Sequence, residues 1–272
     1  MNGKPCSAYL FLALAVVALL ILLPLTPLGC GGDDTPLVLA ATNDLEGSGI
    51  LLAWTDGYQS KTGTQVELVV VPDEQALDMA RHGECDLILT HIPEEEKRLE
   101  RSGYLETGQE IMRDDYVLVG PPADPAGIRE IDKVTDALKK IAETQQIFIL
   151  RIDGSGTAYM QNLLWSISGV SEAGEWLLPT EAGADESLRQ ASQEGAYTLC
   201  GRSSFERLAG ELYLEILLEG DEALVDPYYA AAVSTLTYPD TNLAGAQEFI
   251  DYLLSPDAQS FFSLGAWETP SE

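Results

Sequence analysis

One short segment of the sequence combines the backbone and side-chain groups that bind small anions. Ser155-Gly156-Thr157 stands where a helix is predicted to begin, and Arg151 ends the strand predicted just before it. Unpaired N–H groups and the positive end of the helix dipole favour an anion at such a helix start. The planar guanidinium of Arg151 adds donors suited to an oxyanion. The alternative is structural, with Ser155 only an N-cap and Arg151 only an ion-pair partner of Asp153.

The sequence offers little for catalysis. Ser155 or Cys200 could serve as a nucleophile, but His82 and His91 are the only imidazoles. His82 falls in the last turn of a predicted helix, and the chain has no Gly-x-Ser-x-Gly nucleophile elbow. No His/Cys pair has the ligand spacing of a zinc site. We therefore expect a binding protein and not an enzyme, with no cofactor and no metal among its site residues.

Short β-like runs alternate with helical patterns along the chain. Before a proline-rich interruption at residues 121–125, the patterns predict strands at 37–40, 66–71, 86–90 and 116–120 and helices at 49–61, 75–81 and 94–101. After it they predict helices at 132–144, 156–170, 186–194, 243–254 and 256–262 and strands at 147–150, 197–200 and 228–235. This alternation is typical of a mostly parallel, doubly wound α/β sheet.

The strand at 228–235 returns the chain to the first half of the fold. The predicted architecture is therefore two α/β lobes joined by two crossovers, with lobe I at 37–120 and 225–272 and lobe II at 121–224. Such sheets bind ligands at the carboxyl ends of their strands, and such lobes close by hinge motion. The helix at 156–170 is predicted to bury one stripe, formed by Tyr159, Leu163, Leu164 and Ile167.

The N-terminus predicts export. Lys4 precedes an apolar run over residues 9–23, as in the charged and apolar regions of a signal peptide. The Leu-Gly-Cys sequence that ends at Cys30 resembles a lipobox, in which this cysteine is lipidated, and it defines a signal peptide at 1–29 and a tether at 30–36. The alternative is an uncleaved anchor, because about 20 apolar residues span a bilayer. Either reading places the folded part on the extracytoplasmic face of the cell membrane.

The composition excludes one class of partner. The chain has 44 acidic and 15 basic residues and a formal charge of −29. It lacks the basic footprint of a nucleic-acid-binding protein, so we expect a solvated acidic surface and no nucleic acid. Cys85 and Cys200 fall in different predicted lobes, and we expect two free, partly buried thiols and no disulfide.

Four segments, specific in their order and spacing, carry a family resemblance. They are residues 86–91 with Pro93 and the acidic run 94–96, residues 115–128, Arg151 with Asp153 and Ser155-Gly156-Thr157, and residues 195–199 with Arg202. From about residue 37 to about residue 262 the chain resembles the tungstate-binding proteins of ABC transporters, within the type II periplasmic binding fold. The resemblance implies a lipid-tethered solute-binding protein that delivers a tungstate- or molybdate-class oxyanion to an ABC permease. It also implies that Arg151, the Ser155-Gly156-Thr157 turn and Arg202 belong to the ligand site.

The first lobe departs from the family pattern. Thr42, Asn43 and Asp44, the predicted ligand contacts of this lobe, stand where the family has a hydroxyl-rich stretch, and Asp73 and Glu74 replace part of a Gly-Thr-Gly sequence. An ionised carboxylate near a dianion is repulsive. One alternative is therefore a ligand with a cationic or hydroxyl-bearing part, or a hard cation held by the three acids. The other is that the acids only cap helices, and a third possibility for the whole chain is a ligand sensor that is not coupled to transport.

Overall fold

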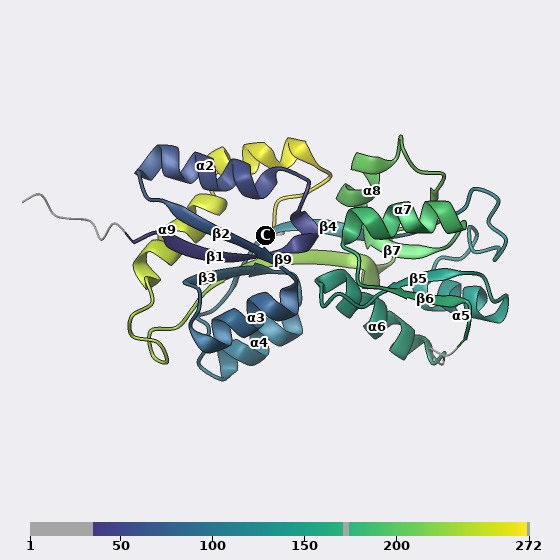
Figure 1. Ribbon diagram of the computed structural model, residues 1–272, viewed down its shortest axis with the longest axis horizontal. Coiled ribbons are helices and arrows are strands. Elements are labelled where there is room, and N and C mark those ends of the chain that lie inside the picture. The colour runs from purple at the N-terminus through teal and green to yellow at the C-terminus, as the bar shows by residue number, and fades with distance from the viewer. Residues whose placement is uncertain (1–34, 171–173, 271–272) are drawn as a thin grey trace, which may run out of the picture. The chain divides into compact units, whose positions relative to one another are not determined.

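The computed structural model describes residues 35–170 and 174–270 (Figure 1). The predicted signal peptide and Cys30 lie outside the described residues. In the described part, no helix combines the length and the apolar character that a membrane crossing needs.

The elements follow the predicted α/β alternation. The first lobe contains strands β1 (Leu37–Thr42), β2 (Val66–Val71), β3 (Leu87–Thr90) and β9 (Val225–Ala232), and helices α2 (Ile50–Thr62), α3 (Asp73–His82), α4 (Pro93–Arg101), α9 (Leu243–Leu253) and α10 (Pro256–Gln259). The second contains β5 (Phe148–Arg151), β6 (Leu177–Thr180), β7 (Thr198–Gly201) and β8 (Glu215–Leu218), and helices α5 (Val134–Glu143), α6 (Gly156–Ser168), α7 (Ala184–Glu194) and α8 (Arg202–Leu208). β4 (Gln109–Gly120) belongs to both lobes.

Several predicted helix ends are confirmed by their caps. Gly63 and Gly83 adopt the left-handed conformation after α2 and α3, as expected for a glycine C-cap. The Ser255 hydroxyl accepts a hydrogen bond from the Ala258 amide, so it is the N-cap of α10. The helix predicted to reach residue 262 ends at Gln259 and continues as a 3₁₀ turn over Ser260–Leu264. The sequence patterns did not predict β6, β8 or α8.

The sheet is less parallel than the alternation predicted. β1 pairs in parallel with β2 and β3, and β5 pairs in parallel with β6. β9 pairs antiparallel with β3 and β4, and β4 pairs antiparallel with β7 and β8. The expectation of a mostly parallel sheet was therefore wrong, because the strand that returns from the second lobe inserts between β3 and β4 and runs against both.

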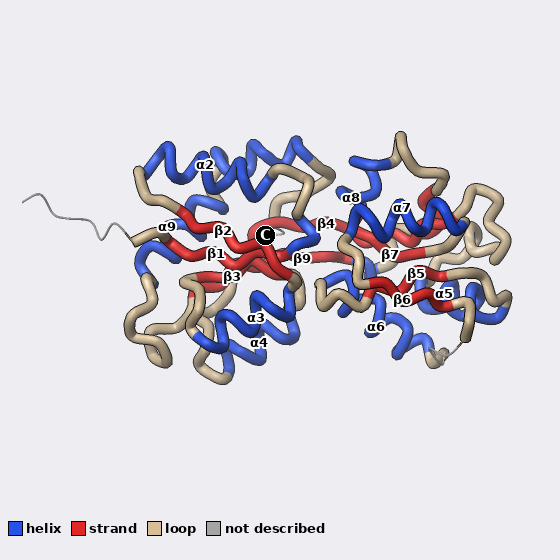
Figure 2. The backbone as a smooth tube through the Cα atoms, in the orientation of Figure 1, coloured by secondary structure: helices blue, strands red, loops and turns tan. Residues whose placement is uncertain are grey.

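A single strand carries the chain from one lobe to the other. Residues 109–115 of β4 pair with β9, whereas residues 116–120 pair with β7 and β8. The first crossing therefore lies inside β4 and not at the prolines 121–125, and the strand begins seven residues before the predicted one. Its first half was missed because polar residues interrupt the apolar pattern there. Figure 2 shows β4 and β9 as strands that run between the two groups of helices.

Each lobe has an apolar core on both faces of its sheet. In the first lobe, Trp54 of α2 packs in the same cluster as Phe249 of α9, and α3 and α4 cover the opposite face. In the second lobe, Trp165 of α6 belongs to one cluster, and α7 and α8 contribute to the other. Cys85 and Cys200 lie in clusters of different lobes. Within the described ranges both are free, as predicted, and both are buried and not only partly so.

The buried face of α6 differs from the predicted stripe. Leu164 is buried, but Leu163 is 39% exposed and Ile167 is 58% exposed. The helix instead turns Gln161 and Trp165 inward. Gln161 accepts a hydrogen bond from the Arg151 amide (2.7 Å) and donates one to the Leu199 carbonyl. A polar side chain thus holds a core-facing position, which an apolar pattern does not reveal.

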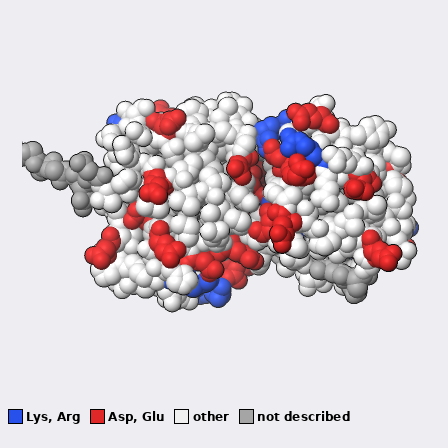
Figure 3. Space-filling view, in the orientation of Figure 1, with Lys and Arg blue, Asp and Glu red and all other residues white. Residues whose placement is uncertain are grey.

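Figure 3 shows Asp and Glu spread over the visible face, with Lys and Arg in a few small groups. This distribution agrees with the solvated acidic surface expected from the composition.

Candidate functional site

The candidate site is built at the carboxyl ends of strands in both lobes. Thr42 ends β1, Asp73 follows β2 as the first residue of α3, and His91 follows β3. Arg151 ends β5 and precedes α6, whose first residue is Gly156. In open α/β sheets this edge is where ligands bind, so the topology gathers the polar groups at the expected place.

The first turn of α6 donates hydrogen bonds to carboxylates of the other lobe. The Gly156 amide donates to Oδ2 of Asp73 (2.8 Å). The amide and hydroxyl of Thr157 both donate to Oδ2 of Asp44 (3.1 and 2.7 Å). Ser155 is the N-cap, with its hydroxyl accepting from the Ala158 amide (3.2 Å). Ser155 therefore has the structural role of an N-cap. The neighbouring donors of Gly156 and Thr157, which were predicted to bind an anion, donate to carboxylate oxygens of Asp73 and Asp44.

Gly156 is required by its surroundings. A Cβ atom at this position would lie 2.2 Å from Nε2 of His91. The backbone of α6 can approach the first lobe this closely only because residue 156 has no side chain.

Arg151 is buried between two carboxylates. Its Nη1 forms an ion pair with Oδ1 of Asp44 (2.7 Å), and its Nη2 donates to Oδ2 of Asp153 (2.6 Å). Burial acts to lower the pKa of Arg151, but Asp44 and Asp153 outweigh it and raise that pKa. Burial likewise acts to raise the pKa of Asp44, and Arg151 with the hydrogen bonds to this carboxylate brings it far below the usual range. Both groups are therefore charged at neutral pH.

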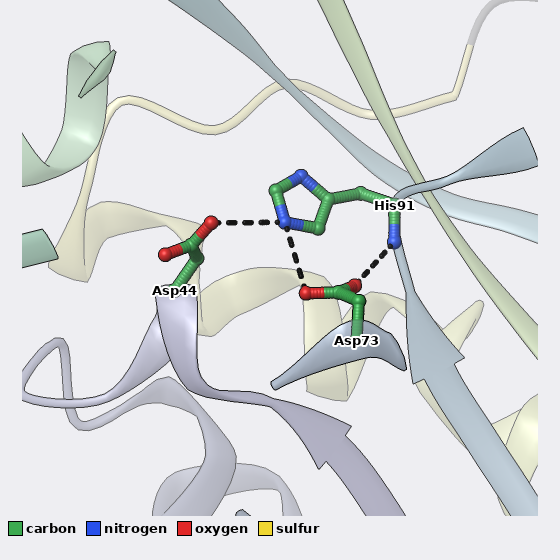
Figure 4. A group of neighbouring side chains, drawn as sticks. All are labelled: Asp44, Asp73 and His91. Atoms are coloured by element: carbon green, nitrogen blue, oxygen red, sulfur yellow. Dashed lines mark hydrogen bonds and ion pairs between the residues drawn. The ribbon is translucent and has the colours of Figure 1, made fainter. Parts of the chain in front are cut away.

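Asp44, Asp73 and His91 form a buried cluster (Figure 4). Nε2 of His91 lies 3.2 Å from Oδ2 of Asp44 and 3.5 Å from Oδ2 of Asp73. Oδ1 of Asp73 accepts a hydrogen bond from the His91 amide (3.1 Å), and its Oδ2 accepts one from the hydroxyl of Thr42 (2.6 Å). The segments that follow β1, β2 and β3 in the first lobe thus converge on one point.

The other ring nitrogen of His91 faces a third carboxylate. Nδ1 of His91 lies 2.8 Å from Oδ1 of Asp226, which belongs to β9, and 3.2 Å from the Tyr116 hydroxyl. The Tyr228 ring stacks on the imidazole, with 4.4 Å between centroids and 7° between planes. Burial acts to lower the pKa of His91, but Asp226 and the neighbouring groups raise it overall. The ring is thereby fixed in position and orientation.

The structure brings together most of the predicted site residues. Thr42, Asp44, Arg151 and the Ser-Gly-Thr turn meet between the lobes, joined by Asp73 from the acidic alternative. Two predicted residues lie elsewhere. Asn43 lines a separate surface pocket with the start of α7, and Arg202 pairs with Glu219 (2.6 Å). Glu74 of the acidic alternative is exposed, but its amide donates to the Gly154 carbonyl of the other lobe (3.0 Å).

His91 and Asp226 were not predicted as site residues. His91 was considered as a catalytic base and as the end of the family-like segment 86–91, and Asp226 was not considered. A signal for His91 was present, because it follows a predicted strand just as Asp44 and Asp73 follow theirs. Asp226 had no such signal, since it lies within β9 and reaches the site only through strand pairing.

The fold and the site together define a two-lobed solute-binding protein. The model of the family described as the PBP superfamily domain matches residues 32–257, and the chain belongs to this family. Within that family, the predicted resemblance to tungstate-binding proteins is confirmed by individual relatives, three of which follow.

The chain is 32% identical over 237 residues, 85% of its length and 69% of the relative's, to a Haloferax volcanii protein named provisionally as an ABC transporter anion-binding protein. It is 29% identical over 261 residues, 91% of each chain, to the tungstate-binding protein TupA of Peptoclostridium acidaminophilum. The crystal structure of the tungstate ABC transporter from Geobacter sulfurreducens superposes with a TM-score of 0.75 at 29% identity, covering 85% of this chain and 99% of that one. These proteins are transport components and not enzymes, which confirms the expectation of a binding protein.

Proposed function

We propose that the chain is the extracytoplasmic solute-binding component of an ABC uptake system and that it binds an oxyanion of the tungstate and molybdate class. The observation that carries this proposal is the convergence of donors from the second lobe. The guanidinium of Arg151, the amides of Gly156 and Thr157 and the Thr157 hydroxyl all point at anionic oxygens between the lobes. Relatives named for tungstate and anion binding support the same ligand class.

The oxygens at this point come from the protein's own Asp44 and Asp73. They stand in for the oxygens of a bound oxyanion, because they accept the hydrogen bonds that such a ligand would take. An oxyanion therefore binds when the lobes separate and these carboxylates withdraw from α6. Chains that are closed by their own Asp44 and Asp73 cannot bind the oxyanion. The apparent affinity is therefore the intrinsic affinity multiplied by the fraction of chains that are open and able to bind.

The test is a calorimetric titration of the purified full chain with tungstate, molybdate, sulfate and phosphate. We expect tungstate or molybdate to bind, and Thr157→Val to weaken binding about tenfold, the value of one hydrogen bond to a charged group. Thr55→Val, which removes a buried hydroxyl from α2, is the matched control and should leave affinity unchanged. If none of the four oxyanions binds, or if Thr157→Val binds as tightly as the native chain, this proposal is wrong.

A second ligand class is favoured by the two first-lobe carboxylates. Asp44 and Asp73 are buried at the interface and accept hydrogen bonds there, so a ligand with a hydroxyl or a cationic group could replace the α6 donors. The same titration with small polar metabolites separates the two classes. Binding of a metabolite without binding of any oxyanion would favour this second class.

We also propose a lipid anchor and limits for the two lobes. Cys30 becomes the lipidated N-terminus after loss of residues 1–29, and residues 30–36 form the tether. The predicted lobe limits are kept except at the crossing inside β4, which moves residues 116–120 to the second lobe, so the lobes comprise 37–115 with 225–272 and 116–224. The anchor is supported by the lipobox-like sequence before Cys30. Mass spectrometry of the membrane fraction should find a diacylated cysteine at the new N-terminus, and Cys30→Ala should abolish processing. A chain that retains residue 1 in the membrane would instead identify an uncleaved anchor.

A further inference from the structure

His91 has a ring nitrogen without a hydrogen-bond partner inside the candidate site. Among the described residues, its Nε2 makes no hydrogen bond although the side chain is fully buried. The same atom points at one oxygen of Asp44 and one of Asp73 (Figure 4). We propose that Asp44, Asp73 and His91 hold a divalent transition-metal ion of the zinc class. This inference concerns a cation and goes beyond the proposed oxyanion function. Both proposals use Asp44 and Asp73, and zinc loading in the absence of oxyanion tests this one by itself.

The spacing of the three atoms suits a shared ion. Zinc is bound at about 2.0–2.1 Å from imidazole nitrogen and about 2.0–2.2 Å from carboxylate oxygen, so two ligands of one tetrahedral ion are about 3.3 Å apart. Nε2 of His91 lies 3.2 Å and 3.5 Å from the two carboxylate oxygens, and all three atoms lie within 4.8 Å of one another. The two separations from Nε2 therefore match those expected for two ligands of one ion.

Asp226 provides the support that metal-binding imidazoles usually have. A ligating histidine typically donates its other ring N–H to a carboxylate, which fixes its tautomer and orientation. Nδ1 of His91 lies 2.8 Å from Oδ1 of Asp226, and stacking on Tyr228 holds the ring plane. With an ion bound, the proton would stay on Nδ1 and the lone pair of Nε2 would face the ion between the two carboxylates.

The charge around this point calls for a cation. The carboxylates of Asp44, Asp73 and Asp226 are buried, and Asp153 lies beside them with its side chain 5% exposed. Arg151 is the only guanidinium paired to this group in the described part of the chain. The imidazole of His91 also faces three of these carboxylates. Uncompensated buried charge is costly, and a divalent ion that replaces the Nε2 proton would add one net positive charge.

The donor set selects the kind of metal. One imidazole nitrogen and two carboxylate oxygens suit zinc and similar transition metals, whereas Ca²⁺ takes six to eight oxygens. Arg151 pairs with Oδ1 of Asp44, and Oδ2, which faces Nε2 of His91, would bind the ion in addition to accepting the two hydrogen bonds from Thr157. Three protein ligands leave one position of a tetrahedral ion for water or a ligand oxygen.

The test measures metal on the purified full chain, stripped with a chelator and free of oxyanions. Titration with zinc chloride should load one zinc per chain, counted by mass spectrometry of the metal. We expect His91→Ala to lose at least 100-fold in zinc affinity, and Asp226→Asn to lose about 10- to 100-fold as a supporting residue does. His82→Ala removes the other histidine of the chain, on the exposed end of α3, and should bind zinc like the native protein.

X-ray absorption of the zinc-loaded native chain makes the test independent of variant folding. The proposal predicts one imidazole, oxygen ligands and no sulfur. Sulfur in the coordination shell, binding that survives His91→Ala, or absence of binding at micromolar zinc would each overturn it. In the last case Nε2 carries a proton shared between the two carboxylates.

Discussion

The carboxylate of Asp73, the first residue of α3, accepts a hydrogen bond from the amide of Gly156, the first residue of α6 (2.8 Å). Two helix starts that would each favour an anion therefore share one protein carboxylate across the lobe interface. The carboxylate of Asp44 likewise accepts a hydrogen bond across the interface, from the hydroxyl of Thr157 in the first turn of α6. The described conformation is closed by the chain's own acids, so under the proposed function ligand binding is a competition between these acids and the solute.

Removing one competing carboxylate should strengthen oxyanion binding. In Asp44→Asn, the amide lacks the charge that holds the Arg151 and Thr157 donors. Since a hydrogen bond to a charged group contributes about 1.5–3 kcal/mol, we expect tungstate affinity to rise about tenfold or more in calorimetric titration. Asp56→Asn, an exposed change on α2, is the control. Weaker tungstate binding by Asp44→Asn would mean that this carboxylate helps to hold the ligand.

Adding a methyl group at Gly156 should prevent the lobes from closing. The Cβ of Gly156→Ala would lie 2.2 Å from the His91 ring, which Asp226 and Tyr228 hold in place. We expect a larger radius of gyration in small-angle X-ray scattering and a loss of about 1–3 kcal/mol in stability, as in an overpacked core. Gly210→Ala, with open space around its Cβ, should change neither quantity. An unchanged radius would show that the imidazole can move aside.

Replacing Arg151 should cost stability as well as ligand binding. The side chain is 1% exposed and neutralises Asp44 and Asp153, so Arg151→Ala leaves two buried carboxylates without their cation. Breaking a buried pair in this way costs about 3–5 kcal/mol, which urea unfolding can measure. Arg189→Ala, whose ion pairs are loose and exposed, should cost less than about 1 kcal/mol. A fully stable Arg151→Ala chain would mean that the acids take up protons or separate at little cost.

The pH dependence of stability should depend on Glu96. Burial raises the pKa of its carboxyl from 4.5 to about 8. The folded chain therefore keeps a proton that the unfolded chain releases, so this stabilising contribution is complete below about pH 4.5 and is lost as the pH rises to about 8. We expect Glu96→Gln to unfold like the native chain near pH 4.5 and to be more stable than it by a few kcal/mol near pH 8. The exposed neighbour change Glu94→Gln should give no such divergence. Parallel curves for Glu96→Gln and the native chain would contradict the raised pKa.

The amino-acid sequence alone determined most of the element order, several helix ends and the donor turn of α6. These depend on neighbours a few residues apart, such as Ser255 before Pro256 or Gly83 after α3, and local chemistry decides them. The sequence did not predict the polar first half of β4 or the inward orientation of Gln161. Each depends on partners that are distant in the sequence, and the spacing of apolar residues gives no information about such partners.

Only the tertiary structure decided what the acids and the histidine do. Asp44 is 113 positions from Thr157, and His91 is 135 positions from Asp226. From the sequence, Asp44 could be a helix cap, a ligand contact or a source of repulsion. Long-range pairing of β9 with β3 and β4, together with closure of the lobes, makes it the partner of α6 and Arg151. Such contacts form only when separate elements bury their apolar faces together, and side-chain identity alone does not specify them.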